Sequence, residues 1–113
     1  MIDRKMLSEF VDSVESWRER FPSERGDATQ IVILIEEIGE LARAILRGDK
    51  ESASEEWADA LFVLLKIPYI CELDTGALAR VAAKNSAKTT INYYVNDEGK
   101  VVERGYVYLR SAT

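Results

Sequence analysis

From Glu36 to Asp59 the chain reads EEIGELARAILRGDKESASEEWAD. Its acidic residues stand among apolar ones at helical spacing, which predicts two helices with a short connection between them. Residues three and four apart share one helix face, so Glu37 with Glu40, and Glu56 with Asp59, each project two carboxylates in one direction. If the two helices pack antiparallel, as a short connection favours, the four carboxylates converge.

Converging carboxylates repel one another, and partial burial makes this repulsion worse unless a cation of high charge lies between them. The sequence therefore predicts a metal site with four ligands, namely Glu37, Glu40, Glu56 and Asp59. Glu36 lies close by, and we expect it to be a further ligand, a holder of an outer water or a base. The alternative is a solvated acidic face, but Ile33 and Ala44 make the same face apolar.

The kind of metal follows from the residues that the chain lacks. It has no histidine and a single cysteine, so neither a histidine-containing di-iron site nor a zinc site is predicted. Ligation by carboxylate oxygens suits Mg²⁺, with Mn²⁺ as a substitute. Mg²⁺ bound by few protein ligands keeps positions open for water and substrate phosphates, which points to phosphate chemistry.

The two acidic motifs carry a family resemblance. Glu36-Glu37-Ile38-Gly39-Glu40-Leu41, followed by Glu56-Trp57-Ala58-Asp59, resembles the EExxE…ExxD motif of MazG-like nucleoside triphosphate pyrophosphohydrolases. The resemblance covers roughly Ala28 to Lys88. It implies an all-α, Mg²⁺-dependent enzyme that cleaves a nucleotide between its α and β phosphates, giving the monophosphate and pyrophosphate. It also suggests the removal of non-standard nucleotides as a role.

Basic residues are needed to meet the substrate phosphates, and the fourth predicted helix carries them. In the family this helix commonly bears a lysine, then an asparagine, then a basic residue. Asn85 and Lys88 match the last two, whereas Val81 stands where the lysine would be, which leaves Lys84 or Arg80 as substitutes. The alternative for each is an exposed basic stripe on an amphipathic helix.

Four helices are predicted from apolar spacing, caps and breakers. The first runs from Asp3 to Arg20, and the second from a cap at Asp27 or Thr29 to about Leu46, with Gly48 as C-terminal cap. The third begins near Glu51 or Ser54, and Pro68 should kink it or end its regular hydrogen bonding nearby. The fourth follows a cap at Asp74 or Thr75 and runs to about Thr90.

After residue 92 the apolar period changes. Tyr93–Val95 and Val101–Val102, on either side of the turn-rich Asn96–Gly99, predict a β-hairpin. Tyr106–Leu109 extends its second strand or forms another, with a bulge at Gly105. The predicted fold is therefore all-α, a four-helix bundle with a short C-terminal β-hairpin, in one domain over residues 1–113, helical over 1–92 with the tail at 93–110.

The amino-acid composition of the chain indicates which kinds of partner it can bind. Hydrophobic residues make up 47% of the chain, more than a small four-helix subunit can readily bury, so we expect a homo-oligomer, a dimer or a tetramer. The net charge of −5 argues against binding to nucleic acid or to an anionic membrane. The N-terminus lacks the apolar core of a signal peptide, which favours a cytoplasmic location.

Other readings of the sequence stay open at this point. A dUTPase or a phosphoribosyl-ATP pyrophosphatase of the same superfamily is one, and a non-catalytic helical assembly module is another. We expect both Trp17 and Trp57 to pack in the core rather than to stack on a base. Cys71, which has no visible activating partner, should be a small buried residue.

Overall fold

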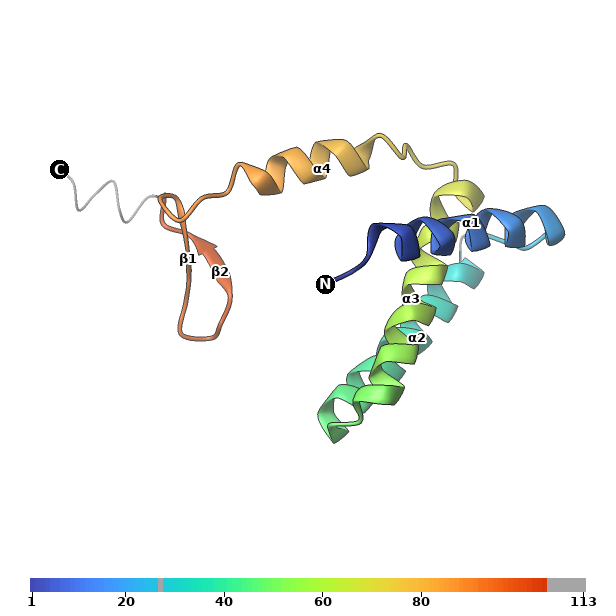
Figure 1. Ribbon diagram of the computed structural model, residues 1–113, viewed down its shortest axis with the longest axis horizontal. Helices are drawn as coiled ribbons and strands as arrows, with labels where there is room; N and C mark the ends of the chain where they lie inside the picture. Colours follow the sequence, from blue (N-terminus) through green and yellow to red (C-terminus); the bar gives the residue numbers. More distant parts are fainter. Residues whose placement is uncertain (27, 106–113) are drawn as a thin grey trace. The chain divides into compact units, whose positions relative to one another are not determined.

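The computed structural model describes residues 1–26 and 28–105. The chain divides into two units, Met1–Asp74 and Thr75–Thr113, which are described separately below. The described residues form four α-helices and one two-stranded antiparallel hairpin (Figure 1). The predicted all-α class with a short C-terminal hairpin is confirmed.

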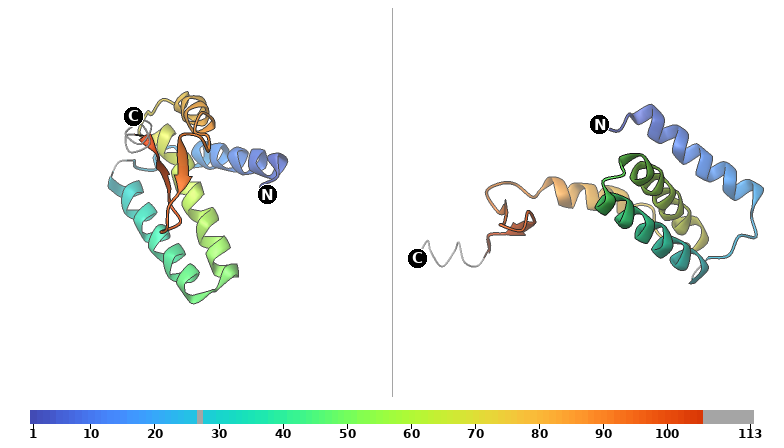
Figure 2. Two further views of the ribbon diagram at one scale, coloured as in Figure 1. Left: turned by 90° about the vertical axis from the view of Figure 1, so that its left-hand side faces the viewer. Right: turned by 90° about the horizontal axis from the view of Figure 1, so that it is seen from below.

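Helices α2 (Ala28–Arg47) and α3 (Lys50–Ile70) are the centre of the first unit. They lie side by side in both Figure 1 and Figure 2, joined only by Gly48 and Asp49. Gly48 has a φ of 73°, the left-handed conformation that favours glycine after a helix, and its N–H donates to the carbonyl of Ile45 at 3.0 Å. So tight a turn forces the two helices to run antiparallel, as predicted.

Helix α3 begins at Lys50, earlier than the predicted Glu51 or Ser54, because Asp49 provides the cap. The Asp49 side chain accepts a hydrogen bond from the N–H of Ser52 at 3.1 Å. Pro68 lies within the helix, which ends two residues later at Ile70, so the predicted end near the proline is confirmed. Cys71, at the C-cap position, is only half-buried.

Helix α1 (Arg4–Arg20) contacts α3 through aromatic side chains. Asp3, predicted as the first helical residue, is the N-cap and accepts from the N–H of Lys5 at 2.7 Å. The rings of Phe10 and Trp17 meet Phe62 edge to face, with centroids 5.9 and 5.5 Å apart. Such pairs contribute roughly 0.5–1.5 kcal/mol beyond the area that they bury.

The buried apolar core of the first unit is small. It consists of Val14, Ala44, Ala60 and Val63. Trp57 is 48% exposed, so its predicted place in the core is wrong for the single chain. The reason is its position on α3, where it borders two shallow apolar pockets, one with Met6 and the other with Ile45, and neither neighbouring helix covers its ring.

A close backbone approach closes the loop between α1 and α2. A Cβ added at Gly26 would overlap the side chain of Ile70, at the end of α3. Only glycine therefore lets this loop lie against the end of α3. The predicted cap at Asp27 lies outside the described residues.

The second unit begins with α4 (Ala77–Ser86). Gly76 takes its N-cap position, so the N-cap lies one or two residues after the predicted Asp74 or Thr75. The helix also ends at Ser86 rather than near Thr90, because the segment after it is rich in threonine and asparagine, which are weak helix formers.

The predicted hairpin is confirmed with strands β1 (Tyr93–Val95) and β2 (Val101–Glu103), paired so that Tyr94 faces Val102. The Asn96 side chain stabilises the turn by accepting from the N–H groups of Glu98 and Lys100, each at 3.0 Å. The described part of β2 ends at Glu103, two residues before Gly105, and the predicted bulge there stays a prediction. The predicted strand at 106–109 lies outside the described residues. No helix among the described residues is long and apolar enough to cross a membrane.

Candidate metal centre and adjoining pocket

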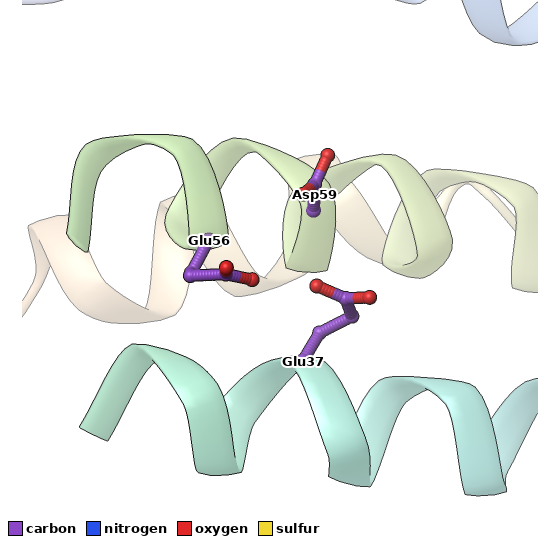
Figure 3. Close-up of side chains that lie close together, drawn as sticks. All are labelled: Glu37, Glu56 and Asp59. Carbon is purple, nitrogen blue, oxygen red and sulfur yellow. The ribbon is translucent and has the colours of Figure 1, made fainter. Parts of the chain in front are cut away.

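The antiparallel packing of α2 and α3 brings three acidic side chains together. Glu37, Glu56 and Asp59 each offer one carboxylate oxygen, and these oxygens all lie within 4.8 Å of one another. Figure 3 shows Glu37 reaching from α2 towards Glu56 and Asp59, which extend from α3. Three of the four predicted metal ligands thus form one group.

Two oxygens in this group are buried without a partner. The Oε2 atoms of Glu37 and Glu56 are both inaccessible to solvent and accept no hydrogen bond within the part of the chain that the structure describes. A buried carboxylate oxygen without a partner is costly, and negative charges close together add repulsion. The donor set is therefore suited to a hard divalent cation, for which carboxylate oxygens are the preferred ligands.

The fourth predicted ligand, Glu40, is exposed and lies beside Glu56 rather than within the group of three. The pKa of Glu40 is raised above the ordinary glutamate value, chiefly by its hydrogen bond to Glu56 and by the negative charge of Glu56, with a smaller contribution from Asp59. Arg43 acts in the opposite direction. Glu36 is also exposed and outside the group.

A pocket of about 470 Å³ opens directly beside these carboxylates. Glu37 and Asp59 form part of its wall. The rest of the wall comes from α1 and α3 and consists of Ser13, Trp17, Arg20, Phe62, Val63 and Lys66. Its size falls within the range of about 300–1,000 Å³ that is usual for small-molecule sites.

Lys66, which the sequence reasoning missed, is the basic residue of this pocket that is buried. It is only 4% exposed, and its Nζ donates to Glu24 Oε2 at 2.9 Å. The same Nζ lies 5.3 Å from the ring centroid of Trp17 and 5.4 Å from that of Phe62. A signal was present in the sequence, because Lys66 is the one charged residue in an apolar run from Ala60 to Ile70.

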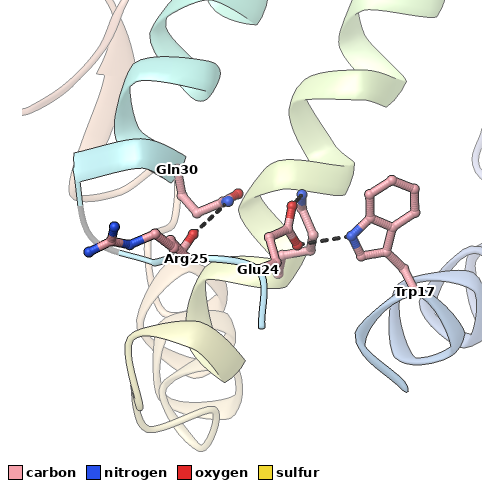
Figure 4. Close-up of polar contacts among 5 residues, drawn as sticks. Trp17, Glu24, Arg25 and Gln30 are labelled. Carbon is pink, nitrogen blue, oxygen red and sulfur yellow. Dashed lines mark hydrogen bonds and ion pairs between the residues drawn. The ribbon is translucent and has the colours of Figure 1, made fainter. Parts of the chain in front are cut away.

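Glu24 is held from two sides. Besides its ion pair with Lys66, it accepts a hydrogen bond from Trp17 Nε1 at 2.9 Å (Figure 4). Burial raises the pKa of Glu24, but the hydrogen bonds from Lys66 and Trp17 and the positive charge of Lys66 outweigh it, so the pKa is lowered overall. Next to it, the buried Gln30 donates to the carbonyl of Arg25 at 2.9 Å, which ties the loop to the start of α2.

The basic residues predicted to bind phosphates belong to the second unit. Arg80, Lys84 and Asn85 are on α4, whereas Lys88 follows the end of that helix, which corrects its predicted place on it. Lys88 Nζ lies 5.6 Å from the ring centroid of Tyr93. Contact of these four side chains with substrate phosphates stays a prediction.

Comparison with known protein families identifies the acidic motifs and their surroundings. Residues 25–91 match the family described as the MazG nucleotide pyrophosphohydrolase domain. A comparison with curated proteins found no match, and a comparison with solved structures found none.

Glu40→Gln should raise the melting temperature of the metal-free protein near neutral pH, because it removes a charge beside Glu56. Because the pKa of Glu40 is raised in the folded protein, protonation of Glu40 increases the free energy of unfolding. This contribution is complete at a pH below the ordinary pKa of 4.5, and it is lost as the pH rises through the pKa of the folded protein. The advantage of the variant should therefore disappear at about pH 4, where wild-type Glu40 is largely protonated.

Thermal melts of both proteins at the two pH values measure this difference. Glu55→Gln, at an exposed position on α3, is the matched control and should change little. A lower melting temperature for Glu40→Gln at neutral pH, or an equal gain for Glu55→Gln, would contradict the interpretation.

Proposed function

Since this chain belongs to the family of MazG nucleotide pyrophosphohydrolase domains, we propose that it hydrolyses nucleoside triphosphates to the monophosphate and pyrophosphate. The reaction depends on Mg²⁺, for which Mn²⁺ can substitute. The substrates include non-standard nucleotides, and the protein acts in the cytoplasm; both statements stay predictions from the sequence.

The observation that carries the proposal is the pair of buried, unpartnered oxygens of Glu37 and Glu56 beside Asp59. Without a cation, this arrangement has repulsion and desolvation but no compensating contact. It also borders a pocket, so a ligand there would meet the carboxylates directly. These features are expected of a site that binds a metal ion together with a phosphate group.

In the proposed mechanism, Glu37, Glu56 and Asp59 would hold the Mg²⁺, with Glu40 beside Glu56 as the fourth predicted ligand. When bound, Mg²⁺ supplies charge neutralisation at the phosphates and lowers the pKa of an attacking water. Glu36 takes the proton from that water as general base.

On the substrate side, the pocket residues orient the nucleoside part and keep water from it. The phosphates are bound by four further residues, namely Arg80, Lys84, Asn85 and Lys88. Their role is carried over from the family's pattern, and at position 81 this chain departs from that pattern.

Asp59→Asn should reduce pyrophosphate release by at least about 100-fold, because the amide weakens metal binding where charge must be neutralised in the transition state. The measurement is pyrophosphate release from a panel of ribo- and deoxynucleoside triphosphates with Mg²⁺. Glu55→Gln is the matched control and should retain activity.

Three outcomes would contradict this proposal. Unchanged turnover in Asp59→Asn would show that Asp59 does not belong to the metal site. Hydrolysis restricted to dUTP or to phosphoribosyl-ATP would favour one of the other enzymes of the superfamily. No pyrophosphate from any nucleotide would favour a non-catalytic helical module.

Mg²⁺ or Mn²⁺ should raise the melting temperature, since a ligand that binds only the folded state stabilises it by about 2.7 kcal/mol at a concentration 100 times its dissociation constant. Thermal melts with and without the divalent cation measure the shift. Sodium chloride at matched ionic strength should do much less, and Glu37→Gln should lose most of the shift. Equal shifts from both salts would indicate general screening rather than a site.

We also propose that the active species is a homo-oligomer, a dimer or a tetramer. Along α2 the single chain exposes large apolar side chains that a partner could cover, namely Ile31, Val32, Ile35, Ile38, Ile45 and Leu46. Their exposed fractions run from 47% to 86%, and large exposed apolar surfaces mark protein–protein contacts.

Sedimentation equilibrium should therefore give a mass of at least two chains under assay conditions. Truncation after Asn92 should weaken this association or the solubility more than it changes the Mg²⁺-induced thermal shift. An active species that sediments as a monomer would overturn the proposed oligomer.

A further inference from the structure

The residues that line the 470 Å³ pocket are of two chemical kinds. Glu37 and Asp59 form one part of its wall, where the proposed function requires a metal ion and phosphates. Trp17, Phe62 and Lys66 form another part, which is aromatic with a single buried amine. A nucleotide whose phosphates lie at the carboxylates could therefore place its nucleoside against Trp17, Phe62 and Lys66.

Lys66 has hydrogen-bonding capacity that its partner does not use. An ammonium group carries three N–H donors, and among the described residues Lys66 donates one hydrogen bond, to Glu24. The same Nζ atom lies over the rings of Trp17 and Phe62, which attract it through cation–π interactions and accept no conventional hydrogen bond. A ligand in the pocket can therefore receive a hydrogen bond from Lys66.

A phosphate is a poor match for this amine. Glu24 balances the charge of Lys66 at 2.9 Å, so the pair offers little net positive charge to a polyanion. The aromatic walls suit a flat, neutral ring. The ligand group that fits is a neutral acceptor on such a ring, and in a nucleotide that group is a carbonyl oxygen of the base.

We infer that Lys66 is a specificity-determining residue that selects nucleobases with a keto group where cytosine and adenine carry an amino group. This inference rests on the proposed function, because it assumes that the carboxylate end of the pocket holds the phosphates. Uracil O4 and hypoxanthine O6 accept a hydrogen bond from the amine. The amino groups of cytosine and adenine would instead point N–H donors at the N–H donors of Lys66, and such a buried mismatch is unfavourable.

Glu24 is a positioning residue in this arrangement. Trp17 Nε1 holds the Oε1 atom of Glu24 at 2.9 Å, while Oε2 receives Lys66, so the carboxylate links the aromatic wall to the amine. This link sets the direction of the Lys66 N–H groups that do not bind Glu24.

The test compares substrate pairs that differ at this one position of the base, UTP with CTP and ITP with ATP. For the wild-type protein with Mg²⁺, kcat/KM should be at least about 10-fold higher for the keto member of each pair. Lys66→Met keeps an unbranched side chain that is one atom shorter and removes the donors, and should bring both ratios close to one through a loss on the keto substrates. Lys5→Met, at an exposed position of α1, is the matched control and should keep the wild-type ratios.

Two further variants guard against a folding defect. The double variant Glu24→Gln with Lys66→Met removes both charges of this ion pair, so that neither is left without its partner, and should show the same collapse of the ratios. Lys66→Arg retains donors and should keep a keto preference. Unchanged ratios in the Lys66→Met variants overturn the inference. An equal loss on all four nucleotides also overturns it, because that result assigns Lys66 to the phosphates.

Binding of the products separates this inference from the proposed activity. Calorimetric titration of UMP and CMP into the wild-type protein with Mg²⁺ needs no turnover. UMP should bind at least about 10-fold more tightly than CMP, and Lys66→Met should remove this difference in affinity. If the protein releases pyrophosphate from no nucleotide, the proposed activity is wrong, and the ratio of the UMP and CMP affinities alone tests the role of Lys66 in base selection. Equal affinities for UMP and CMP overturn the inference even in an active enzyme.

Discussion

The two-residue connection between α2 and α3 constrains the rest of the first unit. Because Gly48 and Asp49 leave no room for any other path, the helices must run antiparallel and in contact. This packing decides which side chains face each other, and it places Glu37 of α2 opposite Glu56 and Asp59 of α3. The helix pair thus contains electrostatic repulsion that the metal-free chain cannot relieve, and its apolar contacts must offset that repulsion.

Those contacts are limited, since the buried apolar residues of the first unit are small ones, Val14, Ala44, Ala60 and Val63. Much of the large apolar surface, including that of Trp57, remains accessible in the single chain. A cation at the carboxylates and a partner chain over the exposed surface would act in the same direction, because each binds the folded state and stabilises it by mass action. Metal binding and assembly are therefore expected to be linked through stability.

The Glu24–Lys66 ion pair is a second polar element, and its Lys66 Nζ lies over the rings of Trp17 and Phe62. A buried ion pair contributes little net stability, because the cost of removing both charges from water cancels most of their attraction. Its value here is geometric: Trp17 and Lys66 bind the two different oxygens of Glu24, so the loop before α2, the end of α1 and the C-terminal part of α3 are fixed to one another. The pocket beside the carboxylates takes its shape from this network.

The sequence by itself determined the helices, the hairpin turn and the acidic motifs with their family, because these depend on local periodicity, caps and residue spacing that need no knowledge of packing. It missed the start of α3 and the early end of α4, where single caps and weak helix formers shift a boundary. Only the tertiary structure decided that Glu40 lies beside the group of three carboxylates, that Trp57 stays half-exposed, and that Lys66 lines the pocket. The reason is physical: the surroundings of a helix residue depend on which neighbouring helix covers its face, and in this chain residues 42 positions apart, Glu24 and Lys66, meet only when α1, α2 and α3 have packed.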